Sequence, residues 1–216
     1  MAAMTGGDAV YETLVALGVE HVFGIPSVHN IPIYDAINRG GAITPIAVRH
    51  EQGALHAADG YARVTGSLGV AITSTGPGAT NAMTGLFEAG FASSRVLMIT
   101  GQTDTQHYGK GKGVLHEAEN QLPMLRSVTR AVGSPRRSEE IPSLMLQVAA
   151  DICTGRPQPG AIEIPVDLQY AEMQAEIPVP SGSFRTEPDS ALLARAGSML
   201  STSAKRIIWA GGGVIS

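Results

Sequence analysis

Short apolar runs that alternate with helical patterns are the feature that most constrains the fold of this chain. The apolar runs predict strands at residues 21–25, 43–48, 69–73, 96–100 and 161–164. Apolar residues at helical spacing predict helices between them, at residues 8–17, 31–37, 52–64, 81–92 and 141–154. Short buried strands separated by helices are typical of a parallel sheet. We therefore predict a doubly wound α/β fold, whose mostly parallel sheet carries helices on both faces.

Prolines and a glycine mark the end of this domain. Pro178, Pro180, Gly182 and Pro188 predict a linker at residues 176–189, after a first domain at residues 1–175. Residues 190–216 then offer one helix (190–200) and one strand (206–210) that runs into Gly211–Gly213. A βα unit needs a helix after such a strand. We expect residues 190–216 to be the truncated start of a central α/β domain, and the chain to be part of a longer protein.

Composition excludes several classes of partner. The chain of 216 residues is 44% hydrophobic and 16% charged, as in a globular domain with a sizeable core. Its net charge is −4, with no basic stripe, so we expect neither nucleic acid nor a membrane surface as a partner. No signal peptide or membrane-spanning run is present in the sequence. Cys153 is the only cysteine, which favours a cytoplasmic protein without internal disulfides.

Two strand-to-helix transitions carry the chemistry. Glu51 follows the predicted strand 43–48, and the turn Thr75-Gly76-Pro77-Gly78 follows the strand 69–73. The carboxyl ends of parallel strands meet at one edge of a sheet, which is where open α/β sheets bind ligands. We therefore expect a small-molecule site with one central carboxyl, shielded from water, beside a glycine-rich turn.

Other interpretations of these two motifs stay open. An acid in the first turn of a helix stabilises the helix dipole by about 0.3–1 kcal/mol without any further role. The turn could equally be a tight strand-to-helix connection with Asn81 as the helix cap. A phosphate-binding loop is excluded in detail, because neither a third glycine nor a Gly-Lys-Ser/Thr sequence follows. The polar, glycine-rich residues 104–113 predict a mobile loop over the same edge.

Taken together, five motifs resemble the N-terminal pyrimidine-binding domain of thiamin-diphosphate enzymes, in the acetolactate-synthase-like branch. The resemblance covers residues 5–175. The motifs are Val22-Phe23-Gly24-Ile25-Pro26, Arg49-His50-Glu51 through Ala58-Asp59-Gly60-Tyr61-Ala62-Arg63, Thr73 through Asn81, Ile99-Thr100-Gly101-Gln102, and Gly155-Arg156-Pro157 through Ile164-Pro165-Val166-Asp167. The second and third motifs are specific when they occur together in this order.

The resemblance implies roles for individual residues. It assigns Glu51 as the acid that hydrogen-bonds N1′ of the cofactor's aminopyrimidine and sets its tautomer, and it makes Gln102 and His116 further catalytic candidates. The cofactor-binding residues that it implies are Glu51, Ile25, Pro26, Ser27, Thr75, Pro77, Gly78 and Asn81. Ser27 departs from the family, in which glycine usually follows the proline. Gln102 could instead be a polar strand end and His116 a surface histidine, because Leu115-His116-Glu117 matches neither the decarboxylases' histidine pair nor the synthases' Phe-Gln-Glu.

The resemblance also implies what the longer protein does. It would decarboxylate a 2-oxo acid and transfer the resulting two-carbon or larger unit to an acceptor, as a lyase or transferase. A simple 2-oxo acid decarboxylase and a non-catalytic ligand-binding module remain as alternatives. Thiamin diphosphate is the implied cofactor, with Mg²⁺ bound through a C-terminal domain of a second subunit in a homodimer or homotetramer. We find no metal-ligand cluster in the sequence itself. Arg156 matches a FAD contact of some synthases, but it could also be an exposed loop arginine.

Overall fold

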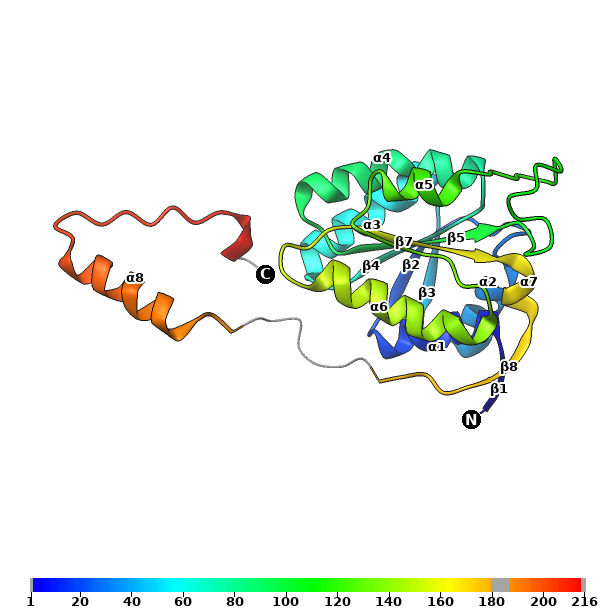
Figure 1. Cartoon of the computed structure of the whole chain (residues 1–216), viewed down its shortest axis with the longest axis horizontal. Coiled ribbons are helices and arrows are strands. Elements are labelled where there is room, and N and C mark those ends of the chain that lie inside the picture. The colour runs from blue at the N-terminus through cyan, green and yellow to red at the C-terminus, as the bar shows by residue number, and fades with distance from the viewer. Residues whose placement is uncertain (1, 180–186, 215–216) are drawn as a thin grey trace.

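A single twisted sheet forms the centre of the computed structural model, which describes residues 2–179 and 187–214. The sheet has six parallel strands in the order β3-β2-β4-β5-β7-β6 (Figure 1). The strands are β2 (His21–Gly24), β3 (Thr44–Ala47), β4 (Gly69–Thr73), β5 (Val96–Gln102), β6 (Ala131–Gly133) and β7 (Gly160–Pro165). Two further strands, β1 (Ala2–Thr5) and β8 (Glu172–Ala175), pair antiparallel beside it. The predicted parallel sheet is confirmed.

Helices cover both faces of this sheet. The helices are α1 (Gly6–Ala16), α2 (Ile31–Gly40), α3 (Glu51–Thr65), α4 (Pro77–Ala92), α5 (Gln121–Arg126), α6 (Ile141–Cys153), α7 (Val166–Tyr170) and α8 (Ser190–Thr202), with 3-10 turns at Ser138–Glu140 and Gly212–Val214. One apolar cluster joins α1, α2 and α6 to the sheet, and a second joins α3, α4 and α5 to its other face (Figure 1). This arrangement confirms the doubly wound α/β fold.

Local sequence explains where the helices begin and end. Thr5 and Asp8 form a capping box at the start of α1, each side chain bonding the other residue's backbone N–H. Gly41 and Gly66 adopt left-handed conformations (φ 72° for both) at the ends of α2 and α3, which glycine accommodates without strain. Proline at the first position of α4 suits a helix start, because its missing N–H would have no partner there.

The direction of the connections reverses between β2 and β4. From β2 the chain crosses to the edge strand β3, whereas from β4 it continues to β5 on the opposite side. Such a reversal is the topological switch point at which doubly wound sheets bind ligands. The segments that come after β2, β3, β4 and β5 all start at the same edge of the sheet, because these strands are parallel.

Some elements differ from the prediction. The strand predicted at 206–210 is wrong: these residues are exposed and pair with no strand in the described part of the chain. A strand forms only where a neighbouring strand can hydrogen-bond its backbone. The apolar pattern of residues 206–210 does not show whether such a neighbour is present. Part of the predicted linker, residues 180–186, lies outside the described residues. Among the described residues, no helix combines the length and apolar character that crossing a membrane requires.

Candidate functional site

The structure brings Glu51 and the glycine-rich turn together. Glu51 is the first residue of α3, and its Oε2 accepts a hydrogen bond of 3.0 Å from the side-chain amide of Asn81 on α4. A Cβ placed on Gly78 would lie 3.2 Å from Glu51 Oε1 and 2.9 Å from Ser74 Cβ. Glycine at position 78 therefore leaves open the space beside the Glu51 carboxyl that any side chain would begin to fill.

Asn81 does not cap α4. The helix begins at Pro77, with Gly76 as its cap residue and no side-chain cap bond, so Asn81 lies in the second turn. The interpretation of Asn81 as a helix cap is wrong, because proline starts the helix earlier than the apolar spacing indicated. Position 81 instead allows the amide to reach across to α3 and hold Glu51.

Glu51 is partly buried, less than the sequence argument expected for a shielded acid. Its strand, β3, is the edge strand and is exposed along its length, so little of the described chain covers this side of the site. At the start of α3, His50 Nδ1 accepts the backbone N–H of Gln52 (3.2 Å), which makes His50 the helix cap. The carboxyl of Glu51 therefore also lies in the favourable field of a helix N-terminus.

The loop after β2 reaches the same edge and has a fixed shape. The side chain of Asn30, which is fully buried, accepts the backbone N–H of Ser27 (2.7 Å) and donates to the carbonyl of Ile25 (3.1 Å). Pro26, between these two anchor points, is exposed. The three residues predicted to bind the cofactor therefore lie on a loop that Asn30 holds in place, and Asn30 was not among the predicted site residues.

His116 lies against the turn, together with a histidine that sequence reasoning missed. His116 has a left-handed backbone (φ 58°) and is exposed, and its ring stacks on the buried His29 with centroids 5.5 Å apart. Ser74 Oγ is 3.4 Å from Nδ1 of each ring, at the long limit of a hydrogen bond. Burial and the nearby His116 lower the pKa of His29. Nothing in the local sequence pairs these histidines, because they come from loops far apart in the chain.

Behind the turn lies a buried polar network. Gln102 is fully buried, donates to Glu163 Oε2 (3.1 Å) and accepts the backbone N–H of Thr103 (2.8 Å). Thr75, also buried, donates to Gln121 Oε1 (2.8 Å). Glu163 and Gln121 were missed by sequence reasoning. A charged residue inside the apolar run 161–164 was a signal for Glu163, whereas nothing in the sequence marked Gln121.

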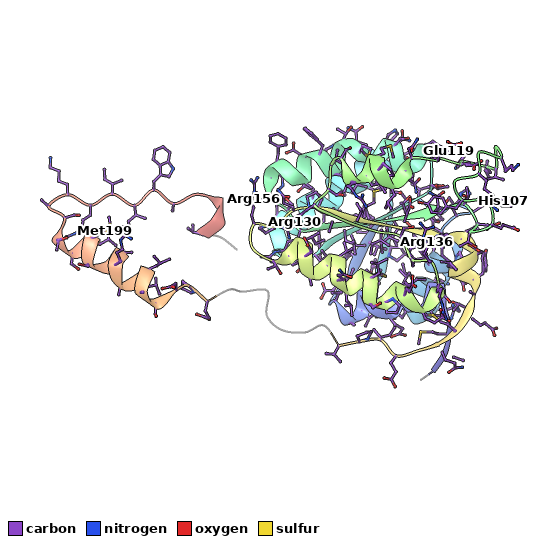
Figure 2. The ribbon with its side chains drawn as sticks, viewed as in Figure 1. His107, Glu119, Arg130, Arg136, Arg156 and Met199 are labelled. Carbon is purple, nitrogen blue, oxygen red and sulfur yellow. The ribbon has the colours of Figure 1, made fainter. Side chains whose placement is uncertain are left out.

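Arg156 lies at the other edge of the sheet. Figure 2 shows Arg156 beside Arg130, at the end of the sheet away from His107 and Glu119. Arg156 Nε donates to Ser93 Oγ (2.7 Å), and both arginines line a hollow of about 410 Å³ whose other walls include Phe87 and Phe91. Among the described residues, no group of three histidine, cysteine or acidic side chains could hold a metal ion.

Comparisons with known proteins identify the family. Residues 4–124 match the family described as "Thiamine pyrophosphate enzyme, N-terminal TPP binding domain". An acetolactate synthase of Arthrospira platensis is 38% identical over 225 residues, covering 98% of this chain and 38% of the relative. The acetolactate synthase large subunit of Lactococcus lactis is 37% identical, covering 97% of this chain and 37% of the relative. A Pseudomonas aeruginosa protein named "Probable 2-ketoarginine decarboxylase AruI" is 35% identical, covering 99% and 38%.

These matches agree with the site geometry. The family match includes Glu51, Ser74 and the turn that approaches them, and thiamine pyrophosphate is another name for thiamin diphosphate. The chain spans less than two-fifths of the length of these relatives, which were each matched over 37–38% of their own length. The chain therefore belongs to the thiamine pyrophosphate enzyme family, as an N-terminal TPP binding domain of the kind found in acetolactate-synthase-like proteins.

Proposed function

We propose that the Glu51 carboxyl receives the aminopyrimidine of thiamin diphosphate, in an enzyme that decarboxylates a 2-oxo acid and transfers the product carbon unit to an acceptor. The observation that carries this proposal is the position of Glu51 beside the open face of Gly78, with Asn81 holding one carboxyl oxygen. The other oxygen, Oε1, faces the space that glycine leaves free. A carboxyl oxygen placed in this way can hydrogen-bond the ring nitrogen of a flat heterocycle.

The residues around Glu51 have separable tasks. Glu51 would hold a proton at the pyrimidine N1′ atom, and Asn81 would keep the carboxyl aimed at it. The loop of Ile25, Pro26 and Ser27 and the turn of Thr75, Pro77 and Gly78 would limit where the ring can lie. When bound, thiamin diphosphate supplies the carbon nucleophile and the electron sink for decarboxylation. The chain's own contribution is to bind the pyrimidine ring, to orient it and to hold one proton at its N1′ atom.

We assign the diphosphate and its Mg²⁺ to a C-terminal domain that would come from a second subunit of a homodimer or homotetramer. The exposure of β3 and the partial burial of Glu51 support a partner surface on this side. The domain limits of 1–175, 176–189 and 190–216 belong to this proposal. So does a cytoplasmic location, which the single buried cysteine favours. FAD is not included, since Arg156 bonds the end of α4 at the opposite edge.

A simple decarboxylase is the second candidate. The match to a protein named as a 2-ketoarginine decarboxylase and the histidine pair of His29 and His116 beside the turn favour it. The two candidates differ in product. A synthase given pyruvate forms a larger 2-hydroxy-3-oxo acid, whereas a decarboxylase releases the free aldehyde, so product analysis with pyruvate and with larger 2-oxo acids separates them.

The test of the main proposal is the Glu51→Gln substitution in the full-length protein. Glutamine keeps the size of the side chain but cannot exchange a proton with N1′. We expect turnover to fall by about 100-fold or more, the usual effect of losing an acid–base group, while thiamin diphosphate still binds. Glu12→Gln, on the exposed face of α1, is the matched control and should leave turnover unchanged. Unchanged turnover in Glu51→Gln would remove the catalytic assignment of Glu51, whereas a wild-type protein that binds the cofactor but turns over no 2-oxo acid would favour a non-catalytic binding module.

A further inference from the structure

A buried carboxyl group lies on the strand β7, behind the site. Glu163 is on β7, opposite Thr100 of β5, and is 0% exposed. Its donors among the described residues are neutral. The amides of Gln102 and Gln121 each lie 3.1 Å from Oε2, and the Tyr108 hydroxyl donates to Oε1. Burying a carboxyl costs free energy even when protein donors replace its water. If packing were the only role of position 163, an apolar side chain would stabilise the core more than a carboxyl does.

Glu163 helps to fix the orientation of Gln121. Gln121 Nε2 donates to the Gly101 carbonyl (3.0 Å) and to Glu163 Oε2 (3.1 Å). Gln121 Oε1 accepts the Gly76 backbone N–H and the Thr75 hydroxyl, both at 2.8 Å. If the Gln121 amide were turned over, its NH2 group would face the Gly76 N–H and the Thr75 hydroxyl. Its oxygen would then face two acceptors, the Gly101 carbonyl and the Glu163 carboxyl. With Glu163 and the Gly101 carbonyl as acceptors and the Gly76 N–H as a donor, only one orientation of Gln121 satisfies all its partners.

The Gly76 backbone that Gln121 holds has an unusual conformation. Gly76 has φ 58° and ψ −112°, a combination that is costly for any residue with a side chain. A Cβ at this position would also lie 2.4 Å from the carbonyl oxygen of His116. Gly78, two residues further on, is the residue that approaches Glu51. The Gln121 bond therefore stabilises the strained part of the turn that shapes the space beside Glu51.

The same carboxyl also holds the loop after β5. Tyr108 lies in the polar, glycine-rich loop predicted at 104–113, and its hydroxyl bonds Glu163. Burial and this bond raise the pKa of Tyr108 to about 12. A second connection joins Thr105 to Asp167, with the Thr105 backbone N–H 3.0 Å from Asp167 Oδ1. Glu163 thus contacts both the loop over the site edge and the residue that anchors the turn.

We propose that Glu163 is a positioning residue of the thiamin diphosphate site, which fixes the Gln121 amide, anchors Gly76 and so keeps the Gly78 side of the turn open beside Glu51. This inference rests on the proposed function for its cofactor. In this proposal Glu163 lies behind the turn and acts on Gly76 through Gln121. Its predicted effect falls on residues 74–78 and on the loop that Tyr108 anchors, which distinguishes it from a general contribution to stability.

Hydrogen exchange measured by mass spectrometry on the full-length protein tests this proposal. Glu163→Leu, similar in size but without an acceptor, should speed exchange of the Gly76 amide by about tenfold, because a lost hydrogen bond of about 1.4 kcal/mol corresponds to that factor. Glu163→Gln keeps one oxygen that both amides can share, so its effect should be smaller but measurable. The dissociation constant for thiamin diphosphate with Mg²⁺ should rise in the same order.

Thr13→Val is the matched control. The Thr13 hydroxyl, fully buried in α1, donates to the Ala9 carbonyl (2.6 Å), so this variant loses a buried hydrogen bond away from the site. It should lower the melting temperature without changing Gly76 exchange or cofactor affinity. Gly76 exchange equal to wild type in Glu163→Leu overturns the proposal. If Glu163→Leu does not fold, Gly76 exchange equal to wild type in Glu163→Gln overturns the proposal instead. A change of Gly76 exchange in Thr13→Val as large as in the Glu163 variants also overturns it.

The two proposals fail in different ways. If the wild-type protein binds no thiamin diphosphate, the proposed function fails, and the exchange data still decide whether Glu163 anchors Gly76. If the wild-type protein binds the cofactor but Gly76 exchange does not depend on Glu163, the positioning role fails and the proposed function stands.

Discussion

At the scale of single residues, the environment of His29 depends on a loop far away in the sequence. His29 is buried at the edge of the sheet, stacked on His116 at a centroid distance of 5.5 Å. Burial disfavours the imidazolium, and so does the second ring when it is charged, so the pKa of His29 is lowered from its ordinary value of 6.5. The folded protein therefore prefers neutral His29 at a pH where the unfolded chain is already charged.

This preference predicts a loss of stability in mild acid. The contribution of His29 is complete above pH 6.5, the value for the unfolded chain, and is lost as the pH falls through its lower pKa in the folded state. NMR titration of His29 should give a midpoint below 6.5, and His116→Asn should move that midpoint upward. In His29→Gln, the part of the acid destabilisation that comes from this residue should disappear. A His29 midpoint at or above its ordinary value would contradict this account.

Single residues also show where sequence reasoning reached its limit. The meeting of Glu51 with the turn followed from the rule that parallel strands share a carboxyl edge, and the structure has that arrangement. Glu163 and Gln121 could not be paired in this way. Their contact depends on the position of α5, a six-residue helix that comes after an irregular loop, and side-chain hydrogen bonds of this kind leave no periodic pattern.

At the scale of elements, a glycine sets the distance between α3 and α4. A Cβ on Gly85 of α4 would lie 2.3 Å from Leu55 Cβ, well inside a normal contact. The two helices carry Glu51 and Asn81, whose hydrogen bond spans the same interface. Close packing at Gly85 therefore supports the geometry of the site as well as the core.

Gly85→Ala should push these helices apart. Overpacking of this kind costs about 1–3 kcal/mol of unfolding free energy, and we expect weaker thiamin diphosphate binding because Asn81 moves away from Glu51. Gly60→Ala is the matched control, since no atom lies within 4 Å of a Cβ at that α3 position. It should stabilise the helix by about 0.4–1 kcal/mol. Urea unfolding of both variants checks the pair; equal effects would show that Gly85 is not a packing contact.

Among the elements, those with long or fully apolar patterns were predicted well. The strand β4 has the predicted limits, α3 is one residue longer than predicted at each end, and α6 ends one residue earlier than predicted. Several short elements were missed, among them the three-residue strand β6 and the four-residue strands β1 and β8. These strands exist because each has a partner already in place, and pairing between distant segments is not visible in a local pattern.

At the scale of the whole molecule, the described residues 187–214 contribute nothing to the core. Every described residue from 187 to 214 is exposed, and α8 buries none of its residues. Large apolar side chains are among them: Leu192, Met199, Ile207, Ile208 and Trp209, the last 96% exposed. Large apolar side chains exposed together in one segment indicate an interaction surface or a tendency to self-associate. The described residues 187–214 therefore gain no stability from packing on the first 175 residues.

Deleting residues 187–216 from the 216-residue chain should therefore leave its melting temperature within about 2 °C, because a loss of 1 kcal/mol would shift it by at least that much. The same deletion should reduce self-association, measured by analytical ultracentrifugation, since it removes the exposed apolar side chains. Deleting residues 172–216 is the informative comparison. It also removes β8, which pairs with β1 and buries Met173, so the melting temperature should fall clearly. Were the shorter deletion as destabilising as the longer one, residues 187–216 would have to pack on the domain in solution.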